Sequence, residues 1–224
     1  MTSVYEPKQA VTARRIAVIS AHTSPLAALG GRESGGMNVY VRELSRELGA
    51  RGYGIDVFTR RTSAADAETQ PFGPNARVIN IDAGPAQLVD KDSITGHLAE
   101  FERNVRAFIE RGRLSYDVVH SHYWMSGVVG RNLAAEWRVP HVVMFHTLGE
   151  VKKRARISEH EPPARIAAER QIAEMADRIV VASQHEKHLL TALYGAAPER
   201  IDIVPCGVDL DRFYPMEKEY ARRK

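Results

Sequence analysis

A glycine-rich stretch that leads directly into an amphipathic segment is the first feature of the sequence that could do chemistry. Four of the seven residues in the stretch 30–36 are glycines, and residues 34–51 carry apolar side chains at helical spacing. Glycines let a backbone approach a ligand closely, and the free amides and dipole of a helix N-terminus favour an anion. The pattern therefore predicts a phosphate or pyrophosphate cradle at Gly35 and Gly36. A flexible loop that merely precedes a helix is the alternative interpretation.

Histidine and hydroxyl side chains follow three of the apolar runs that we expect to form strands. They are His22 in SAHTSP, His120, His122 and Tyr123 in HSHYW, and His146 and Thr147 in FHTLGEVKKR. An H-x-H pair could also bind zinc, but no cysteine or carboxylate stands at a recognisable ligand spacing, so we predict no metal site. His141, His185 and His188 are expected to be packed or solvent-exposed rather than functional.

Alternating strands and helices must position these side chains. The expected strands are 15–20, 55–59, 77–81, 117–120, 141–145, 178–182 and 201–204. The expected helices are 34–51, 93–111, 125–137, 165–176 and 184–194. The first has the apolar stripe Met37, Val41, Leu44 and Leu48. The second has Leu98, Phe101, Val105 and Phe108 on one face. Ser183 and Glu186 have the spacing of a capping box for the last helix.

Continuously apolar strands separated by helices predict an α/β fold with a doubly wound parallel sheet, covered on both faces. Residues 62–75 are expected to be a polar loop and residues 148–163 a basic one. Lys91 is expected in a turn, and Arg165 at the start of a helix. Sheets of this type bind ligands beyond the carboxyl ends of their strands, at the topological switch point, which is where the histidines above would lie.

Composition narrows the function classes. The chain has 224 residues and a formal net charge of +3, which gives no reason to expect a nucleic-acid or membrane partner. Cys206 is the only cysteine, so no internal disulfide can form and a reducing cytoplasm is expected. No apolar run approaches the roughly 18–20 residues of a membrane helix. Residues 1–14 have no apolar signal-peptide core and are interpreted as a disordered leader.

Several cofactor motifs are missing. The dinucleotide fingerprint should follow the first strand at once, but AHTSPLAAL stands there, and the second strand ends in Thr59, Arg60 and Arg61 rather than an acidic residue. The Walker A and G-x-S-x-G patterns are also absent from the sequence. An oxidoreductase is therefore disfavoured, and we expect no cofactor.

Four motifs in order resemble the N-terminal half of retaining glycosyltransferases of family 4. They are ESGGMNVYVRELSRELGARGYGIDVFTRR, HSHYWMSG, HTLGEVK and VPCGVDLDRFYP, and the resemblance spans nearly the whole chain after Arg14. Within the family it is strongest to the branch that glycosylates D-inositol 3-phosphate, which also has HTSP and RVINIDAGP. The sucrose-phosphate synthase branch is similar but usually has glutamine where Met37 stands.

The resemblance implies a Rossmann-like acceptor-binding domain at 15–215 of a two-domain GT-B enzyme. Residues 216–224 would begin the linker to a donor-binding domain that this chain lacks. The nucleotide sugar would be a co-substrate, and a homodimer stays open as an assembly.

The same resemblance implies roles for individual residues. Gly35 and Gly36 would approach the donor phosphates, and His146 would be the catalytic cleft histidine, orienting the donor sugar. The acceptor would be held by a larger set: His22, Met37, Asn38, Lys91, Tyr123, Thr147 and Arg165. Lysine and arginine suit a phosphate because they form charge-assisted hydrogen bonds with its oxygens.

The implied reaction is transfer of a hexosyl unit from a nucleotide sugar to a phosphorylated polyol or sugar, with retained configuration and front-side attack. Inositol phosphate is the favoured acceptor. Two alternatives stay open: transfer to fructose 6-phosphate, and a non-catalytic module that binds a sugar phosphate. This chain alone would be inactive without its donor domain.

Overall fold

One eight-stranded sheet forms the centre of the molecule. The structure, a computed structural model, describes residues 14–28, 35–155, 161–211 and 213–223. The strand order is β3-β4-β2-β1-β5-β6-β7-β8. The strands are β1 (Arg15–Ile19), β2 (Gly54–Arg60), β3 (Thr69–Gly73), β4 (Ala76–Ile81), β5 (Val118–His122), β6 (His141–Met144), β7 (Arg178–Val181) and β8 (Ile201–Ile203).

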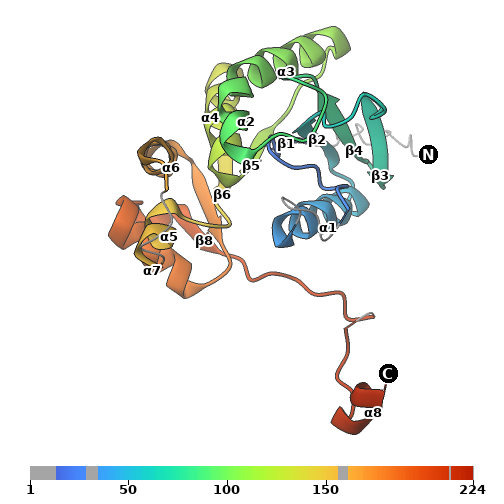
Figure 1. The fold of residues 1–224 in the computed structure, drawn as a ribbon, viewed down its shortest axis with the longest axis vertical. Helices are drawn as coiled ribbons and strands as arrows, with labels where there is room; N and C mark the ends of the chain where they lie inside the picture. The colour runs from blue at the N-terminus through green and yellow to red at the C-terminus, as the bar shows by residue number, and fades with distance from the viewer. Residues whose placement is uncertain (1–13, 29–34, 156–160, 212, 224) are drawn as a thin grey trace, which may run out of the picture.

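Helices connect the strands, except from β2 to β3 and from β3 to β4 (Figure 1). They are α1 (Gly36–Ala50), α2 (Lys91–Ile94), the 3-10 turn η1 (Thr95–His97), α3 (Leu98–Gly112), α4 (Tyr123–Trp137), α5 (Gly149–Ala155), α6 (Pro163–Met175), α7 (Gln184–Tyr194), η2 (Pro198–Arg200) and α8 (Lys218–Arg223). Within the described ranges, no helix has the length and apolar composition needed to cross a bilayer.

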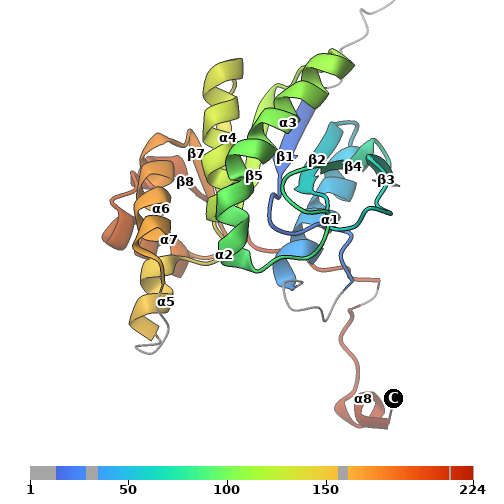
Figure 2. The same ribbon diagram turned by 45° about the horizontal axis from the view of Figure 1, so that its top comes forward.

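The strands bury side chains on both faces, as a doubly wound sheet requires. Val18 and Val57 pack into one apolar cluster, which includes Val41 of α1, while their neighbours Ile19 and Phe58 pack into the other. Because successive strand residues point to opposite faces, the two clusters lie on opposite sides of the sheet. The second cluster contains the apolar faces of α3, α4, α6 and α7. Figure 2 shows α3 and α4 together, apart from α1.

The expectation of a parallel sheet is correct for every strand but β3, which pairs with β4 in the antiparallel sense. β3 lies in the segment 62–75, where we expected only a loop. Its pairing shifts register between Pro71 and Gly73, and Pro71 lacks the amide that a central strand needs. This short stretch contains Pro and Gly and has no alternation of apolar and polar residues, so the sequence does not predict a strand there.

Three expectations about helices were wrong in detail. The expected helix 93–111 is divided into α2, η1 and α3, and Lys91 begins α2 rather than lying in a turn. The expected basic loop 148–163 contains α5. In α1 the buried face carries Ser45 and Gly49, whereas Leu44 is only half-buried. Small residues are needed there because a Cβ on Gly49 would lie 1.9 Å from the Pro74 carbonyl oxygen.

α4 packs closely against the sheet and is buried over most of its surface. Gly130 makes this possible, because a Cβ there would lie 2.9 Å from both the Ser121 Cβ and the His141 Nε2. His141 also contacts the Ser121 Oγ at 2.7 Å, so it is the packed histidine that we expected. α4 begins at Tyr123, the residue that directly follows the end of β5.

The chain leaves the sheet after β8 and leads toward α8 (Figures 1 and 2). Apolar side chains in this segment are exposed, among them Val208 and Leu210. Of the expected leader 1–14, only Arg14 belongs to the described residues. The first part of the glycine-rich stretch, 30–34, also lies outside them.

Candidate functional site

The predicted site residues gather at the carboxyl ends of β1, β5 and β6. β1 pairs with β2 on one side and with β5 on the other. The helix after β1 covers one face of the sheet and the helix after β5 covers the other, so the gap between β1 and β5 is the topological switch point. Ligand sites of doubly wound folds lie there.

The glycine pair begins α1 as expected, with Gly35 at its N-cap and Gly36 as its first residue. A Cβ on either glycine would meet no heavy atom of the described residues within 4 Å. The buried Asn38 fixes this helix start: its Oδ1 accepts from the Gly35 amide at 3.1 Å, and its Nδ2 donates to the Thr23 Oγ1 and the Ser24 carbonyl, both at 2.6 Å. The helix N-terminus is thus open and rigidly joined to the loop after β1.

α1 also contributes Met37 and Tyr40. Met37 packs against both apolar clusters, so part of its side chain serves the core. The Tyr40 ring lies edge-on to His122, with centroids 5.8 Å apart, and to His146, with centroids 5.4 Å apart. We did not single out Tyr40 from the sequence. It stands four residues after Gly36, on the same helix face, which is the signal that could have identified it.

Two cations from distant segments lie over the ring of Tyr123. The Lys91 Nζ is 4.2 Å from the ring centroid and the Arg165 Cζ is 5.1 Å from it. The His22 ring lies 4.7 Å from the same ring, centroid to centroid. Tyr123 has a φ of 73°, a left-handed conformation that is rare for non-glycine residues and recurs at functional sites. These four predicted residues therefore form one cluster.

The buried Arg165 is held by partners within the chain. Its Nε donates to Glu169 at 2.8 Å, its Nη1 to Glu161 at 2.7 Å, and its Nη2 to the carbonyl and hydroxyl of Thr147, both at 3.1 Å. Lys152 also pairs with Glu161, at 2.8 Å. The structure thus brings Arg165 and Thr147 into direct contact and seats a carboxylate of the protein, Glu161, between two cations.

Glu169 organises the helices behind the site, although we did not predict it. It is fully buried, and its carboxylate accepts from the Gly149 amide at 2.9 Å and from the Tyr194 hydroxyl at 2.6 Å. Glu161 and Glu169 stand four residues before and after Arg165. This i,i+4 spacing of opposite charges is a signal that the sequence contained.

A pair of histidines lies beneath Tyr40. The Nδ1 of His122 and the Nε2 of His146 are 3.0 Å apart, and the rings of His120 and His122 are tilted by 46° with their centroids 4.2 Å apart. His122 thus contacts the predicted catalytic histidine directly.

All of the imidazoles in the site are neutral at physiological pH. Burial, followed by the positive charges of Lys91 and Arg165, lowers the pKa of His22 to about 3. Burial lowers the pKa of His120 to about 3 and that of His146 to about 4, and it takes the pKa of His122 well below its usual value. Neutral imidazoles can each donate one hydrogen bond and accept another.

His146 follows β6 in a tight turn. Its φ is 61°, and the Thr147 amide donates to the Phe145 carbonyl oxygen at 2.7 Å, which is the hydrogen bond of a γ-turn. This version of the γ-turn, with positive φ, is rare and strained. The turn fixes the direction in which the His146 ring leaves the strand.

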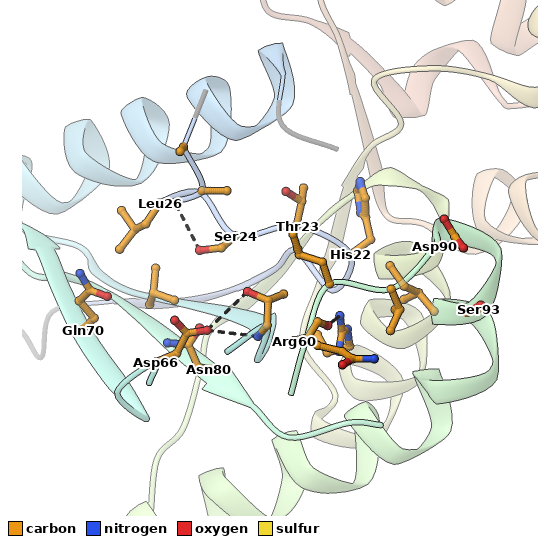
Figure 3. A pocket seen from close by; sticks show the side chains of 18 residues that line it. His22, Thr23, Ser24, Leu26, Arg60, Asp66, Gln70, Asn80, Asp90 and Ser93 are labelled. Atoms are coloured by element: carbon orange, nitrogen blue, oxygen red, sulfur yellow. Dashed lines mark hydrogen bonds between the residues drawn. The ribbon is translucent and has the colours of Figure 1, made fainter. Parts of the chain in front are cut away.

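A pocket of about 760 Å³ lies beside His22, which belongs to the cluster around Tyr123 (Figure 3). His22 and Thr23 line one wall, and Asp90 and Ser93, which flank Lys91 in the sequence, lie at one end. Arg60, which is 3% exposed, donates to the carbonyl oxygens of Pro85 at 2.8 Å and Gln87 at 2.7 Å. Arg60 thereby fixes the segment that leads to Lys91.

A second, apolar pocket of about 300 Å³ is lined by His146 and Thr147 together with residues of α5 and α7. His185, on the rim of that pocket, and His188 are exposed. In the parts of the chain that the structure describes, no three His, Cys, Asp or Glu side chains are arranged to hold a metal ion.

Comparison with known proteins adds to this geometry. A D-inositol 3-phosphate glycosyltransferase from Kribbella flavida is 44% identical over 213 residues, which are 94% of this chain and 50% of the relative. An enzyme of the same name from Mycolicibacterium smegmatis is 45% identical over 214 residues, 94% of this chain and 49% of the relative. The chain therefore spans about half the length of the curated relatives that it matches.

Solved structures agree on the fold. A sucrose-phosphate synthase from Thermosynechococcus elongatus matches with a TM-score of 0.85 and 32% identity, over 94% of this chain and 52% of that one. Anabaena HepE, solved with UDP and glucose, matches with a TM-score of 0.59 at 13% identity, which indicates the fold alone. The expected Rossmann-like unit of a GT-B enzyme is confirmed. The sequence pattern of Glycosyltransferase Family 4 covers residues 34–212, and the chain belongs to that family.

Proposed function

We propose that this chain is the acceptor-binding half of a retaining hexosyltransferase that moves a sugar from a nucleotide sugar to a phosphorylated polyol, with inositol phosphate as the favoured acceptor. The observation that carries the proposal is the placement of Lys91 and Arg165 over the same Tyr123 ring, beside His22. Two cations that distant segments bring to the same ring suit a doubly charged phosphate, which each can bind by charge-assisted hydrogen bonds.

In the proposed complex, Lys91, Tyr123, Thr147 and Arg165 hold the acceptor's phosphate. The polyol ring lies toward His22 and the start of α1, where Met37 and Asn38 are placed. The 760 Å³ pocket beside His22 gives an acceptor room on that side.

The donor's diphosphate meets Gly35 and Gly36. The open space around both glycines supports this role, because a Cβ on either would meet no described heavy atom within 4 Å. Free amides and the dipole of α1 then stabilise the charge that develops on the leaving phosphate.

The reaction we propose is a front-side displacement. The acceptor hydroxyl attacks the anomeric carbon on the face that the diphosphate leaves, so the configuration is retained. The chain positions the reactants and stabilises charge. His146 orients the donor sugar from the end of β6. The donor itself is held by a second domain, and this chain alone is inactive.

A second candidate acceptor is fructose 6-phosphate. The structural similarity to a sucrose-phosphate synthase supports it, since the fold matches with a TM-score of 0.85. The cation cluster suits either sugar phosphate, so the two candidates differ in the ring and not in the phosphate.

The exposed Cys206, the single cysteine of the chain, suits a reducing cytoplasm, where we place the protein.

Isothermal titration calorimetry of this chain tests the proposal. We expect binding of inositol phosphate, weaker binding of fructose 6-phosphate, and a loss of at least about tenfold in affinity for unphosphorylated inositol, since each charge-assisted hydrogen bond is worth about 1.5–3 kcal/mol. Stronger binding of fructose 6-phosphate would favour the second candidate. Equal affinity for inositol with and without its phosphate would refute the assignment of Lys91 and Arg165 to phosphate binding.

A further inference from the structure

The contact between His122 and His146 determines which nitrogen of His146 carries the proton. The His122 Nδ1 and the His146 Nε2 are 3.0 Å apart, so one proton lies between them. Both rings are neutral, because burial lowers the pKa of each. A neutral imidazole has one N–H, and the position of this shared proton therefore fixes the tautomer of both rings.

Only two arrangements satisfy the hydrogen bond. In the first, His122 donates from Nδ1, its Nε2 is a bare lone pair, and His146 carries its proton on Nδ1. In the second, His146 donates from Nε2, and His122 carries its proton on Nε2. The Nε2 of His122 decides between them, because it is buried and has no hydrogen-bond partner among the described residues.

A buried N–H without an acceptor is rarer and costlier than a buried lone pair without a donor. The second arrangement would place such an N–H at the Nε2 of His122, a fully buried residue. The first arrangement avoids it. In the first arrangement His146 presents an N–H at Nδ1, which has no hydrogen-bond partner in the described part of the chain.

Packing keeps both rings in place. Tyr40 lies edge-on to both, and the His120 ring packs against His122 in a tilted arrangement. The γ-turn centred on His146 restricts its backbone. A 180° flip of the His146 ring would place Cε1 where Nε2 stands and so break the hydrogen bond to His122.

We propose that His122 is a positioning residue, whose hydrogen bond holds His146 as a neutral donor that offers its Nδ1–H to the sugar donor. This inference deepens the proposed function and rests on it only for the identity of the ligand. It assigns to His146 a hydrogen-bond donor role toward a hydroxyl or phosphate oxygen, and it excludes that nitrogen as a proton acceptor.

Side-chain ¹⁵N NMR of the histidines in this chain tests the tautomer directly. In the unmodified protein at pH 7 we expect the His146 Nδ1 to be protonated and its Nε2 to be an acceptor. His122→Leu should abolish this preference and shift the tautomer ratio about tenfold, which is the effect of losing one ordinary hydrogen bond. A protonated Nε2 in the unmodified protein would overturn the proposal.

Matched variants separate positioning from folding. In His122→Asn the side-chain amide can replace the Nδ1–H, so the tautomer of His146 should be retained. In His120→Asn, which removes a ring packed against His122 but no hydrogen bond to His146, the tautomer should also be retained. If His122→Asn and His122→Leu gave the same ratio, or if His122→Leu left it unchanged, the proposal would be wrong.

Calorimetry keeps this result distinct from the proposed function. A fixed tautomer in a chain that binds no sugar phosphate would reject the proposed function alone. Normal acceptor binding with an unbiased tautomer would reject the role of His122 alone. Thermal unfolding of each variant confirms that the NMR spectra come from folded protein.

Discussion

The guanidinium of Arg165 is paired with the carboxylate of Glu161 at 2.7 Å, on the cation cluster that we assign to the acceptor's phosphate. Only 3% of the Arg165 side chain and 9% of the Glu161 side chain are exposed. A phosphate that binds Arg165 through Nη1 must therefore displace a carboxylate of the protein. Glu161 competes with the ligand for both Arg165 and Lys152.

We expect Glu161→Gln to strengthen the binding of a phosphorylated acceptor. The neutral amide keeps the size of the side chain but competes less well for two cations, and the gain should be about fivefold, or about 1 kcal/mol. Calorimetry with inositol phosphate measures it. Unphosphorylated inositol is the control, and an equal gain for it would show that Glu161 acts on the ring and not on the phosphate.

Lys91→Met should weaken phosphate binding without unfolding the protein. The variant keeps most of the apolar stem over Tyr123 and removes the ammonium, so we expect at least about a tenfold loss of affinity for the phosphorylated acceptor. Arg165→Ala is a poorer test, because it leaves Glu169 buried without its cation and should cost about 3–5 kcal/mol of stability. If folded Lys91→Met bound the phosphorylated acceptor with unchanged affinity, Lys91 would not be part of the acceptor site.

Gly36→Val should stop turnover and spare the fold. A Cβ at Gly36 points into space that no described atom occupies within 4 Å, so the melting temperature should change by only a few degrees. The larger side chain should exclude the donor's diphosphate from the start of α1. Turnover is measured in the protein that includes the donor-binding half. Full activity there would mean that the glycines only turn the chain.

The buried neutral histidines make stability depend on pH. The pKa of His120 is about 3 in the folded protein and 6.5 when unperturbed. Between these values the unfolded state binds one more proton, so the free energy of unfolding is highest above pH 6.5. It falls as the pH drops, by up to about 1.4 kcal/mol per pH unit for each such histidine.

Urea unfolding at pH 5, 6 and 7 measures this slope. His120→Gln should reduce it by up to about 1.4 kcal/mol per pH unit, whatever its effect on stability at pH 7. His188→Gln is the control, because His188 lies exposed on α7. An unchanged slope in His120→Gln would show that His120 takes up its proton without unfolding.

The central strands could be predicted because they are continuous apolar runs, and a parallel sheet buried on both faces requires such runs. β3 could not, because TQPFG contains no alternation and pairs with a single strand, β4. α5 was missed for a similar reason. Its sequence is mostly charged, and the Glu169 carboxylate that accepts from the amide of Gly149, its first residue, belongs to another helix.

The cation cluster shows what sequence reasoning can and cannot reach. The resemblance named Lys91 and Arg165, and both lie over Tyr123. The partners Glu161 and Glu169 were visible as i,i+4 neighbours but could not be ranked above ordinary surface pairs. The contact of His122 with His146 joins two strand ends, and it required the register of β5 and β6 to be known.

β3 has a consequence for the molecule in solution. Its short length, the missing amide of Pro71 and the register shift beside it leave the outer margin of the sheet poorly suited to receive a strand from another molecule. This boundary should resist edge-to-edge aggregation, so the protein should stay dispersed at high concentration with β3 intact, and Pro71→Val should make it more prone to form intermolecular β-structure.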